Sequence, residues 1–389
     1  MIKYPLAKET ITNSEIDKLI EWLKKYPKLT MGEVTKQFEK EWAKWIGTEY
    51  AVFCNSGSSA NLLMLYALLV FGKIKRGQKV IVPAVGWGTT IAPIIQLGLE
   101  PIMVDVLKST YELDPSFIDD YDNVCAVMLV HSLGIPAHAE YLRNKCEERG
   151  IYLLEDACAA LGSEYDNGRK VGTHGIMSSF SFYFGHQLST IEGGMVNTND
   201  KEIYETLLMA RSHGWLKDIS ENKKTQLMQD YNIDSFHSPF TFFIPGFNLR
   251  STDLQAYLGL LQMEKADWVV ERRDRNHRRY RDNFSGTEII SQTYYPNEKI
   301  CSISFGTRCL SKEKRTKIVA ALVENNIETR LFSAGNLGRH PFWYNHNGKL
   351  SAFPVADLIH NCGFFLPNYP ELELDEIDFI SNIVLEAVT

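Results

Sequence analysis

The chain has 389 residues, 44% of them hydrophobic and 12% aromatic, a composition typical of a globular protein large enough for two domains. Its formal net charge of −7 disfavours nucleic acid as a partner, because phosphate backbones are bound by basic surfaces. The first residues lack a signal-peptide pattern and no apolar run reaches membrane-spanning length, which predicts a soluble, cytoplasmic protein without a membrane partner. Seven scattered cysteines without a C-x-x-C pair predict reduced thiols and no zinc ribbon.

The first part of the chain predicts two helices and then an alternation of strands and helices. Thr12 and Glu15 form a capping box before a helical pattern that stops by Pro27, and a second helix follows Gly32. Short apolar strands are expected at 50–54, 80–82, 102–105, 126–130, 151–155, 179–184 and 195–197. Helical segments separate most of them, so we expect a mostly parallel sheet covered on both faces.

The last part of the chain predicts a smaller lobe. A long charged helix near Glu264–Asn283 leads out of the sheet domain. The remainder, about Tyr294–Thr389, has the pattern strand, helix, strand and final helix. We therefore predict a large domain over residues 1–265, and a linking helix with a small α+β domain over residues 266–389.

The stretch 178–194 is the most informative of the sequence. An alternating aromatic strand is expected to end at Gly185, with His186 fixed at its mouth and a Glu192-Gly193-Gly194 turn before the next strand. Small and polar residues here let the backbone approach a ligand closely. A lone histidine is more often structural than catalytic, so its interpretation depends on the other segments.

Two further segments offer groups that bind a phosphate and a ring. In NSGSSAN (residues 55–61), Gly57 permits a tight turn, and Ser58 with the following backbone amides would form an anion site at a helix N-terminus. A plain serine N-cap explains the same residues. Asp156 ends an apolar strand, where it could bind a pyridine nitrogen or cap the next helix.

The other candidates stand in predicted loops. Trp87 lies between two glycines, where its indole could cover one face of an aromatic cofactor or fill the core. Polar side chains elsewhere could contact phosphate, carboxylate or substrate. These candidates are His213, Asn248, Arg250, Arg330 and Asn336.

Together these segments resemble the family of pyridoxal phosphate (PLP)-dependent sugar aminotransferases and dehydratases, whose motifs they match in order over nearly the whole chain. The resemblance implies the aspartate aminotransferase fold, with a mostly parallel seven-stranded sheet in the large domain and a small α+β C-terminal domain. It also implies that Gly57, Ser58 and Ser181 hold the cofactor phosphate, that Trp87 stacks on the ring, and that Asp156 binds the ring nitrogen.

The same resemblance implies a homodimer with shared active sites. Asn248 would reach the phosphate of the neighbouring subunit's cofactor. The remaining loop candidates, His213, Arg250, Arg330 and Asn336, would contact a nucleotide-diphosphate sugar.

His186 sets the expected chemistry. In the family, a lysine stands six residues before the Glu-Gly-Gly, and here that position is His186. An imidazole cannot form a lasting Schiff base but can move a proton. The chain is therefore similar to the nucleotide-sugar 3-dehydratases, which use PLP and pyridoxamine phosphate (PMP). The resemblance implies removal of the C3 hydroxyl of a 4-keto-6-deoxy sugar, with GDP-4-keto-6-deoxymannose favoured and L-glutamate as amine donor.

Some 3-dehydratases use an iron–sulfur cluster held by closely spaced cysteines. No cysteine occurs between Cys158 and Cys301, so the sequence predicts neither a cluster nor another metal. Gln187, Ala159 and the segment 335–341 depart from the GDP-sugar dehydratases and leave the nucleotide and the sugar open. Two alternatives remain: an aminotransferase on a nucleotide 4-keto-sugar, which needs a lysine elsewhere in the site, and a non-catalytic ligand-binding relative.

Overall fold

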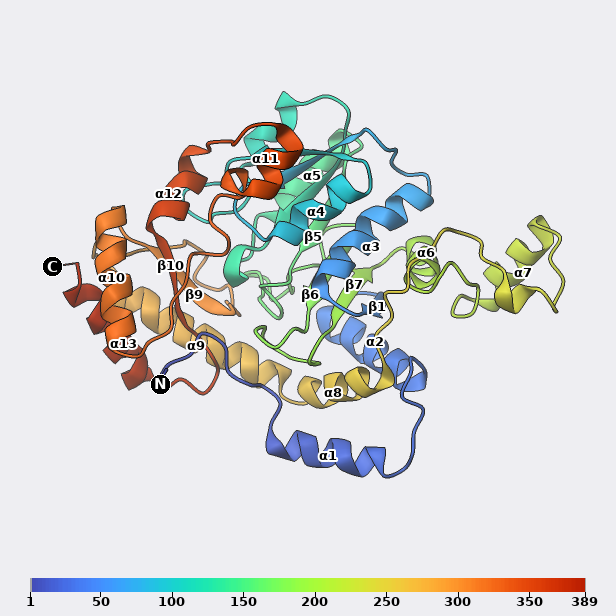
Figure 1. Ribbon diagram of the computed structural model, residues 1–389, viewed down its shortest axis with the longest axis horizontal. Helices are drawn as coiled ribbons and strands as arrows, with labels where there is room; N and C mark the ends of the chain where they lie inside the picture. The colour runs from blue at the N-terminus through green and yellow to red at the C-terminus, as the bar shows by residue number, and fades with distance from the viewer. Residues whose placement is uncertain (1, 389) are drawn as a thin grey trace.

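The computed structural model describes residues 2–388, and its larger lobe is a seven-stranded sheet packed between helices (Figure 1). The strands are β1 (Tyr50–Cys54), β2 (Lys79–Pro83), β3 (Glu100–Val104), β4 (Val124–Val130), β5 (Tyr152–Asp156), β6 (Met177–Ser181) and β7 (Gly194–Thr198). Their order is β1-β7-β6-β5-β4-β2-β3, and β7 alone runs antiparallel to its neighbours. The prediction of a mostly parallel seven-stranded sheet is confirmed.

Helices cover both faces of this sheet. The helices of this lobe are α1 (Asn13–Leu23), α2 (Glu33–Ile46), α3 (Gly57–Val70), α4 (Gly88–Gln96), α5 (Ala139–Glu148), α6 (Lys201–Arg211), α7 (Glu221–Asp230) and α8 (Asp253–Met263), with 3₁₀ turns η1 (Pro115–Asp120), η2 (Ser132–Gly134) and η3 (Ser238–Phe240). Of these, α1 packs on α8 and α7 projects away from the sheet (Figure 1). Helix α3 is apolar around most of its circumference and packs on β6, β7, α4 and α6, as expected for a helix buried on all sides. Its N-terminus is thereby fixed beside the ends of β5 and β6.

Aromatic side chains of α2 pack against β6 and the residues that follow it. Trp42 packs edge-on against Phe180 and Phe182, and Phe38 lies against Phe53 and Phe182. Trp42 also donates from Nε1 to Asn197 on β7 at 2.9 Å. This cluster anchors the strand that leads into the segment carrying His186.

The predicted strand 179–184 is too long. In the structure β6 ends at Ser181, opposite Gly194 at the start of β7. Phe182 still exchanges backbone hydrogen bonds with Gly193 and Thr190, and the chain turns after it. The backbone amide of His186 bonds to the carbonyl of Tyr183 at 2.9 Å, so His186 lies on a turn beyond the strand. The strand thus ends four residues before the predicted end at Gly185, and His186 follows on a turn.

The smaller lobe follows the long helix α9 (Ala266–Phe284). Its antiparallel sheet has the order β10-β9-β8, formed by β8 (Ile290–Ser291), β9 (Ser304–Arg308) and β10 (Gly363–Pro367). Its helices are α10 (Lys312–Glu324), α11 (Pro341–Asn347), α12 (Pro354–Cys362) and α13 (Leu374–Glu386), with the 3₁₀ turn η4 (Leu337–Arg339). Two of these helices, α11 and α12, exceed the predicted pattern of strand, helix, strand and helix.

The N-terminal segment belongs spatially to the smaller lobe. Tyr4 forms a parallel bridge with Ile327, and the backbone amide of Leu6 bonds to the carboxylate of Glu328 at 2.7 Å. The N-terminal segment therefore packs on the smaller lobe, although α1, which follows it, belongs to the larger one. The predicted boundary assigned this segment to the large domain. No helix in residues 2–388 combines the length and apolar character needed to cross a membrane.

Candidate active site

A cavity of about 640 Å³ lies between the large sheet and the smaller lobe. It opens where β4, β5 and β6 end, the edge at which open parallel sheets bind ligands. Its lining includes the predicted residues Gly57, Ser58, Trp87, Asp156, Ser181, His186 and Arg330. A second cavity of about 660 Å³ between α2 and α6 is lined by none of the predicted site residues, so the chemistry belongs to the first.

The N-terminus of α3 forms one end of the cavity. Ser56 caps the helix by accepting a hydrogen bond from the amide of Ser59 at 3.1 Å, and the first amides of a helix have no intrahelical acceptor. A Cβ atom on Gly57 would lie 2.7 Å from Cβ of Ser181 and 2.9 Å from Sγ of Cys158. Only glycine allows this close approach, and it leaves an anion-binding helix end beside Ser181.

Asp156 is held by donors from two helices. Its Oδ2 accepts hydrogen bonds from Nδ2 of Asn61 at 2.9 Å and from Oγ1 of Thr90 at 2.7 Å, and its Oδ1 accepts one from the backbone amide of Cys158 at 3.2 Å. The sequence interpretation missed both side chains. Their spacing was a usable signal, because Asn61 follows Gly57 by four residues and Thr90 follows Trp87 by three, on the same helix faces.

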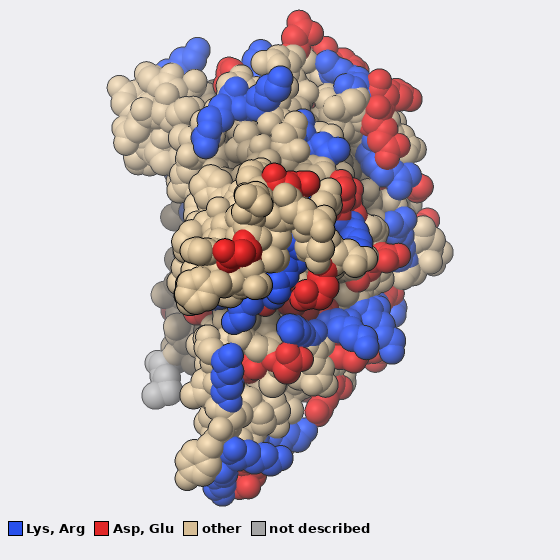
Figure 2. Space-filling model, turned by 90° about the vertical axis from the view of Figure 1, so that its right-hand side faces the viewer, with Lys and Arg blue, Asp and Glu red and all other residues tan. Residues whose placement is uncertain are grey.

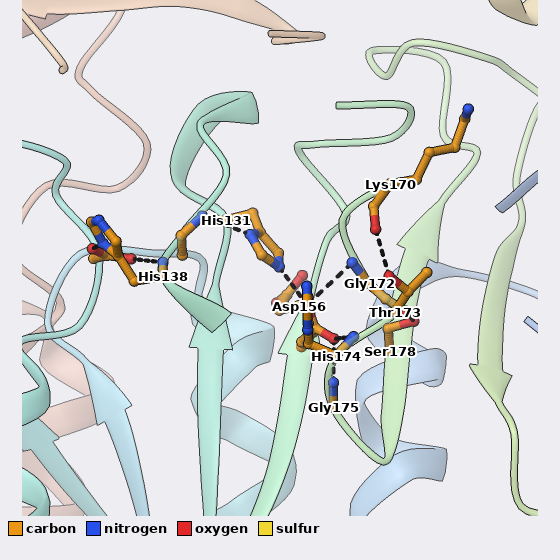
Figure 3. Close-up of polar contacts among 12 residues, drawn as sticks. His131, His138, Asp156, Lys170, Gly172, Thr173, His174, Gly175 and Ser178 are labelled. Atoms are coloured by element: carbon orange, nitrogen blue, oxygen red, sulfur yellow. Dashed lines mark hydrogen bonds and ion pairs between the residues drawn. The ribbon is translucent and has the colours of Figure 1, made fainter. Parts of the chain in front are cut away.

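Glu155, beside Asp156, points away from the cavity and fastens a loop. Its buried carboxylate accepts hydrogen bonds from the amides of Gly172 at 3.1 Å and His174 at 2.7 Å, and it meets Nε2 of His131 at 2.9 Å (Figure 3). Burial alone would raise the pKa of Glu155, but the hydrogen bond from His131 and the surrounding amides outweigh it and lower the pKa. Of the two acids that end β5, only Asp156 is left for a ligand.

His186 presents one free ring nitrogen to the cavity. Its Nδ1 lies 2.7 Å from the carbonyl oxygen of Cys158, and a carbonyl only accepts, so Nδ1 carries the proton and Nε2 keeps a lone pair. Burial lowers the pKa of His186 to about 4, so the ring is neutral at physiological pH. Among the described residues that line the cavity, none is a lysine.

Arg330 faces the cavity from the smaller lobe. Its guanidinium lies over the ring of Phe365, 4.9 Å from the ring centroid, and no acidic side chain within residues 2–388 pairs with it. Burial lowers the pKa of Arg330, and the charge of Glu328 offsets only part of this effect. An anionic ligand in the cavity would supply the missing partner.

The other loop candidates lie outside this cavity. The ring of His213 contacts that of Trp215 at 4.7 Å, and Arg250 lies over the same indole at 5.7 Å. Asn248 is exposed, and its backbone forms an antiparallel β-bridge with Ser212. These residues form the base of a projecting arm, defined here as residues 212–250, which includes α7 (Figure 1).

Asn336 is engaged in the fold. It is fully buried, its Nδ2 donates to Oδ1 of Asp357 at 2.7 Å, and its Oδ1 accepts from the amide of Gly338 at 2.8 Å. These bonds cap η4, and Asn336 does not line the cavity.

Comparison with known proteins identifies the family. The model of the DegT/DnrJ/EryC1/StrS aminotransferase family matches residues 10–385. The chain belongs to this family. A GDP-4-keto-6-deoxy-D-mannose 3-dehydratase of Yersinia pseudotuberculosis is 34% identical, over 97% of this chain and 96% of that protein.

Solved structures of members of the DegT/DnrJ/EryC1/StrS family have the same architecture. An E. coli GDP-4-keto-6-deoxy-D-mannose-3-dehydratase with bound hydrated PLP matches with a TM-score of 0.89 and 30% identity, over 99% of this chain and 100% of that one. A GDP-4-keto-6-deoxymannose-3-dehydratase with a trapped PLP-glutamate geminal diamine matches with a TM-score of 0.87 and 29% identity, over 98% and 100% of the two chains. The predicted family and its aminotransferase-type fold are confirmed.

The two departures at Gln187 and Ala159 are connected in this family member. Gln187 is fully buried, and its Nε2 donates to the carbonyl oxygens of Ala159 at 2.9 Å and Cys301 at 2.6 Å. Gln187 therefore ties the His186 turn to the segment that enters the smaller lobe. The seven cysteines are all free thiols, and no three metal-ligating side chains gather within residues 2–388.

Proposed function

We propose that this protein is a PLP/PMP-dependent 3-dehydratase that removes the C3 hydroxyl of a nucleotide-linked 4-keto-6-deoxy sugar, with GDP-4-keto-6-deoxymannose as the favoured substrate. The observation that carries the proposal is the presence of His186, in place of lysine, in a cavity whose described lining contains no lysine. A free imidazole nitrogen can accept and return a proton, but it cannot hold the cofactor covalently.

The residues of the cavity fit a pyridine ring that carries a phosphate group. The first turn of α3 at Gly57 suits the phosphate. The indole of Trp87, which is 55% exposed, suits one ring face, and Asp156 suits the ring nitrogen. When bound, PMP supplies an amine that reacts with the sugar ketone and a ring that accepts electrons.

His186 performs the proton transfers. Its neutral Nε2 takes a proton from the reacting centre and, once protonated, can deliver a proton to the hydroxyl that leaves C3. The carbonyl of Cys158 holds the Nδ1 proton throughout and stabilises the charged ring. One residue on one side of the cavity can therefore serve both transfers.

Arg330 is the anion-binding side chain of the cavity. We assign L-glutamate as the amine donor, and an unpaired guanidinium suits its carboxylates or the diphosphate of the sugar nucleotide. The overall conversion is balanced: the sugar loses one oxygen, and glutamate leaves as 2-oxoglutarate and ammonia.

The arm supports the assignment of a homodimer with shared sites. Asn248, His213 and Arg250 lie at its base, away from the cavity of their own chain. The arm projects from the body in Figure 1, and Figure 2 shows this side of the molecule, where the surface nearest the viewer is mostly uncharged. Phe236 and Phe240 are 85% and 77% exposed there, which suits contact with a second subunit.

The decisive experiment is mass spectrometry of the product formed from PLP, L-glutamate and GDP-4-keto-6-deoxymannose, with CDP- and dTDP-linked analogues in parallel. A product lighter by one oxygen, released with 2-oxoglutarate and ammonia, is expected with the GDP-sugar. An amine in place of the ketone would establish an aminotransferase instead. Binding without any product would establish a non-catalytic relative.

A further inference from the structure

Two buried polar side chains, Asn61 and Thr90, meet one oxygen of the Asp156 carboxylate. They are 2% and 1% exposed, and they approach Oδ2 at 2.9 and 2.7 Å. The other oxygen, Oδ1, accepts a hydrogen bond from the backbone amide of Cys158 at 3.2 Å, and the Cys158 thiol also interacts with this carboxylate. A carboxylate oxygen can accept two hydrogen bonds, so Oδ1 has room for one more donor.

The amide of Asn61 can lie in only one orientation. Its Nδ2 lies 3.3 Å from the backbone carbonyl of Thr89 as well as near Asp156, and its Oδ1 accepts a hydrogen bond from Oγ of Ser179 at 2.6 Å. Because the Thr89 carbonyl only accepts, the nitrogen must be on that side. Asn61 is thus an obligate donor to Oδ2, and the acidic proton cannot reside on that oxygen.

Both donors belong to helices that begin at the cavity. Asn61 lies one turn after Gly57 in α3, and Thr90 lies one turn after Trp87 at the start of α4. Residues three or four apart occupy the same helix face. Helices α3 and α4, which begin at Gly57 and next to Trp87, therefore each also supply one hydrogen-bond donor to the carboxylate of Asp156.

We propose that Asn61 and Thr90 are positioning residues that turn Oδ1 of Asp156 toward the ring nitrogen of the cofactor and thereby keep that nitrogen protonated. The inference rests on the cofactor site of the proposed function, but it is independent of the sugar and of the reaction. A role confined to folding would satisfy the same hydrogen bonds without affecting the ring nitrogen.

The test uses PLP labelled with nitrogen-15 in the ring and bound to the full-length protein without sugar or glutamate. Nuclear magnetic resonance reports the pH at which the ring nitrogen loses its proton. We expect this pH to fall by about one unit in Thr90→Val and in Asn61→Leu, because a carboxylate that has lost one of its two side-chain donors can turn away from the ring nitrogen and weaken the hydrogen bond that holds its proton. Thr90→Ser keeps a hydroxyl and should restore the wild-type value.

The matched control is Thr206→Val, which removes a buried helical hydroxyl that bonds only to the carbonyl of Glu202. The inference would be overturned if, in both Thr90→Val and Asn61→Leu with PLP bound, the ring nitrogen lost its proton at the same pH as in the wild-type protein. This would hold even if the variants were thermally less stable. If one of these variants does not fold, the other is used for the test. The inference is also contradicted if Thr90→Ser does not show the wild-type deprotonation pH. Absence of PLP binding by the wild-type protein would overturn the proposed function and this inference together.

Discussion

A single hydrogen bond defines the chemistry of His186. The carbonyl of Cys158 fixes the proton on Nδ1, and burial keeps the ring neutral, so Nε2 is ready to accept a proton at physiological pH. Lysine at the same position would be a nucleophile, whereas this imidazole is a base. In the proposed function, this one side chain and its immediate partner therefore decide which chemistry the site performs.

Replacing His186 by asparagine should abolish the reaction but retain the cofactor. An amide cannot accept and return a proton, so we expect at least about a hundredfold loss of product formation. PLP affinity, measured by absorbance titration, should stay within a few-fold of wild type, because the phosphate and ring contacts remain. His346→Asn, an exposed histidine in α11, is the control and should behave as wild type. Unchanged turnover in His186→Asn would refute its role as the base.

Gly57→Ala should weaken cofactor binding. The added methyl group would lie under 3.0 Å from Ser181 and Cys158, so the helix end must shift away from the anion that it binds. We expect at least about a tenfold rise in the Kd of PLP. Gly88→Ala is the matched change, because a Cβ there meets nothing within 4 Å. Equal PLP affinity in the two variants would contradict the phosphate assignment.

At the scale of elements, the turn between β6 and β7 depends on a side chain and not on regular pairing. Gln187 joins the turn to the carbonyls of Ala159 and Cys301, which belong to segments far apart in the sequence. The turn that carries His186 is thereby attached to both lobes. Its conformation is set by tertiary contacts that no local pattern contains.

Gln187→Leu should destabilise the protein. Leucine has a similar size but leaves two buried carbonyl oxygens without a donor, at an expected cost of about 1–3 kcal/mol in the free energy of unfolding. Urea denaturation measures this difference, and Gln229→Leu on exposed α7 is the control. A loss of unfolding free energy no greater than that of the control would show that the two hydrogen bonds of Gln187 contribute nothing to stability.

The sequence was informative about elements and less so about their ends and contacts. Apolar runs located strands β1 to β5 of the large sheet, because buried strands are largely hydrophobic. The aromatic alternation continues through Phe182 and Phe184, so it predicted a longer β6 than the pairing with β7 allows. Asn61 and Thr90 were missed because their shared target becomes evident only when α3 and α4 lie side by side.

At the scale of the whole molecule, buried neutral histidines make stability depend on pH. Burial lowers the pKa of His186 to about 4 and that of His277 to about 3, whereas an unfolded histidine titrates near 6.5. Below about pH 6.5 the unfolded chain binds protons that the folded chain does not. The stability contributed by these groups is complete above that pH and is lost as the pH falls toward the folded values.

We therefore expect the urea midpoint to fall between pH 7 and pH 5, and to fall less in His186→Asn than in the wild-type protein. The variant lacks one of the groups that the unfolded chain protonates. His346→Asn, with its exposed ring, should show the wild-type decline. Identical declines in all three proteins would contradict a lowered pKa at His186.

The proposed sharing of active sites between two subunits predicts complementation between inactive variants. His186→Asn and Asn248→Ala, each inactive alone, should regain up to about one quarter of wild-type activity when subunits are mixed and allowed to exchange. Half of the dimers are then mixed, and one of their two sites has both native residues. Light scattering should show a dimer, and a mixture as inactive as its components would contradict a site completed by the neighbouring arm.

Because the described lining of the cavity contains no lysine, the protein depends in a particular way on the supply of the coenzyme. A covalent tether retains its coenzyme through dilution and purification, whereas this site must rely on the lifetime of a reversible complex. Occupancy should follow the free vitamin B6 phosphate concentration, and gel filtration should yield colourless protein that regains full activity on addition of PLP. The protein would then compete with other B6-binding enzymes for a common pool, and its output would reflect the vitamin status of the cell.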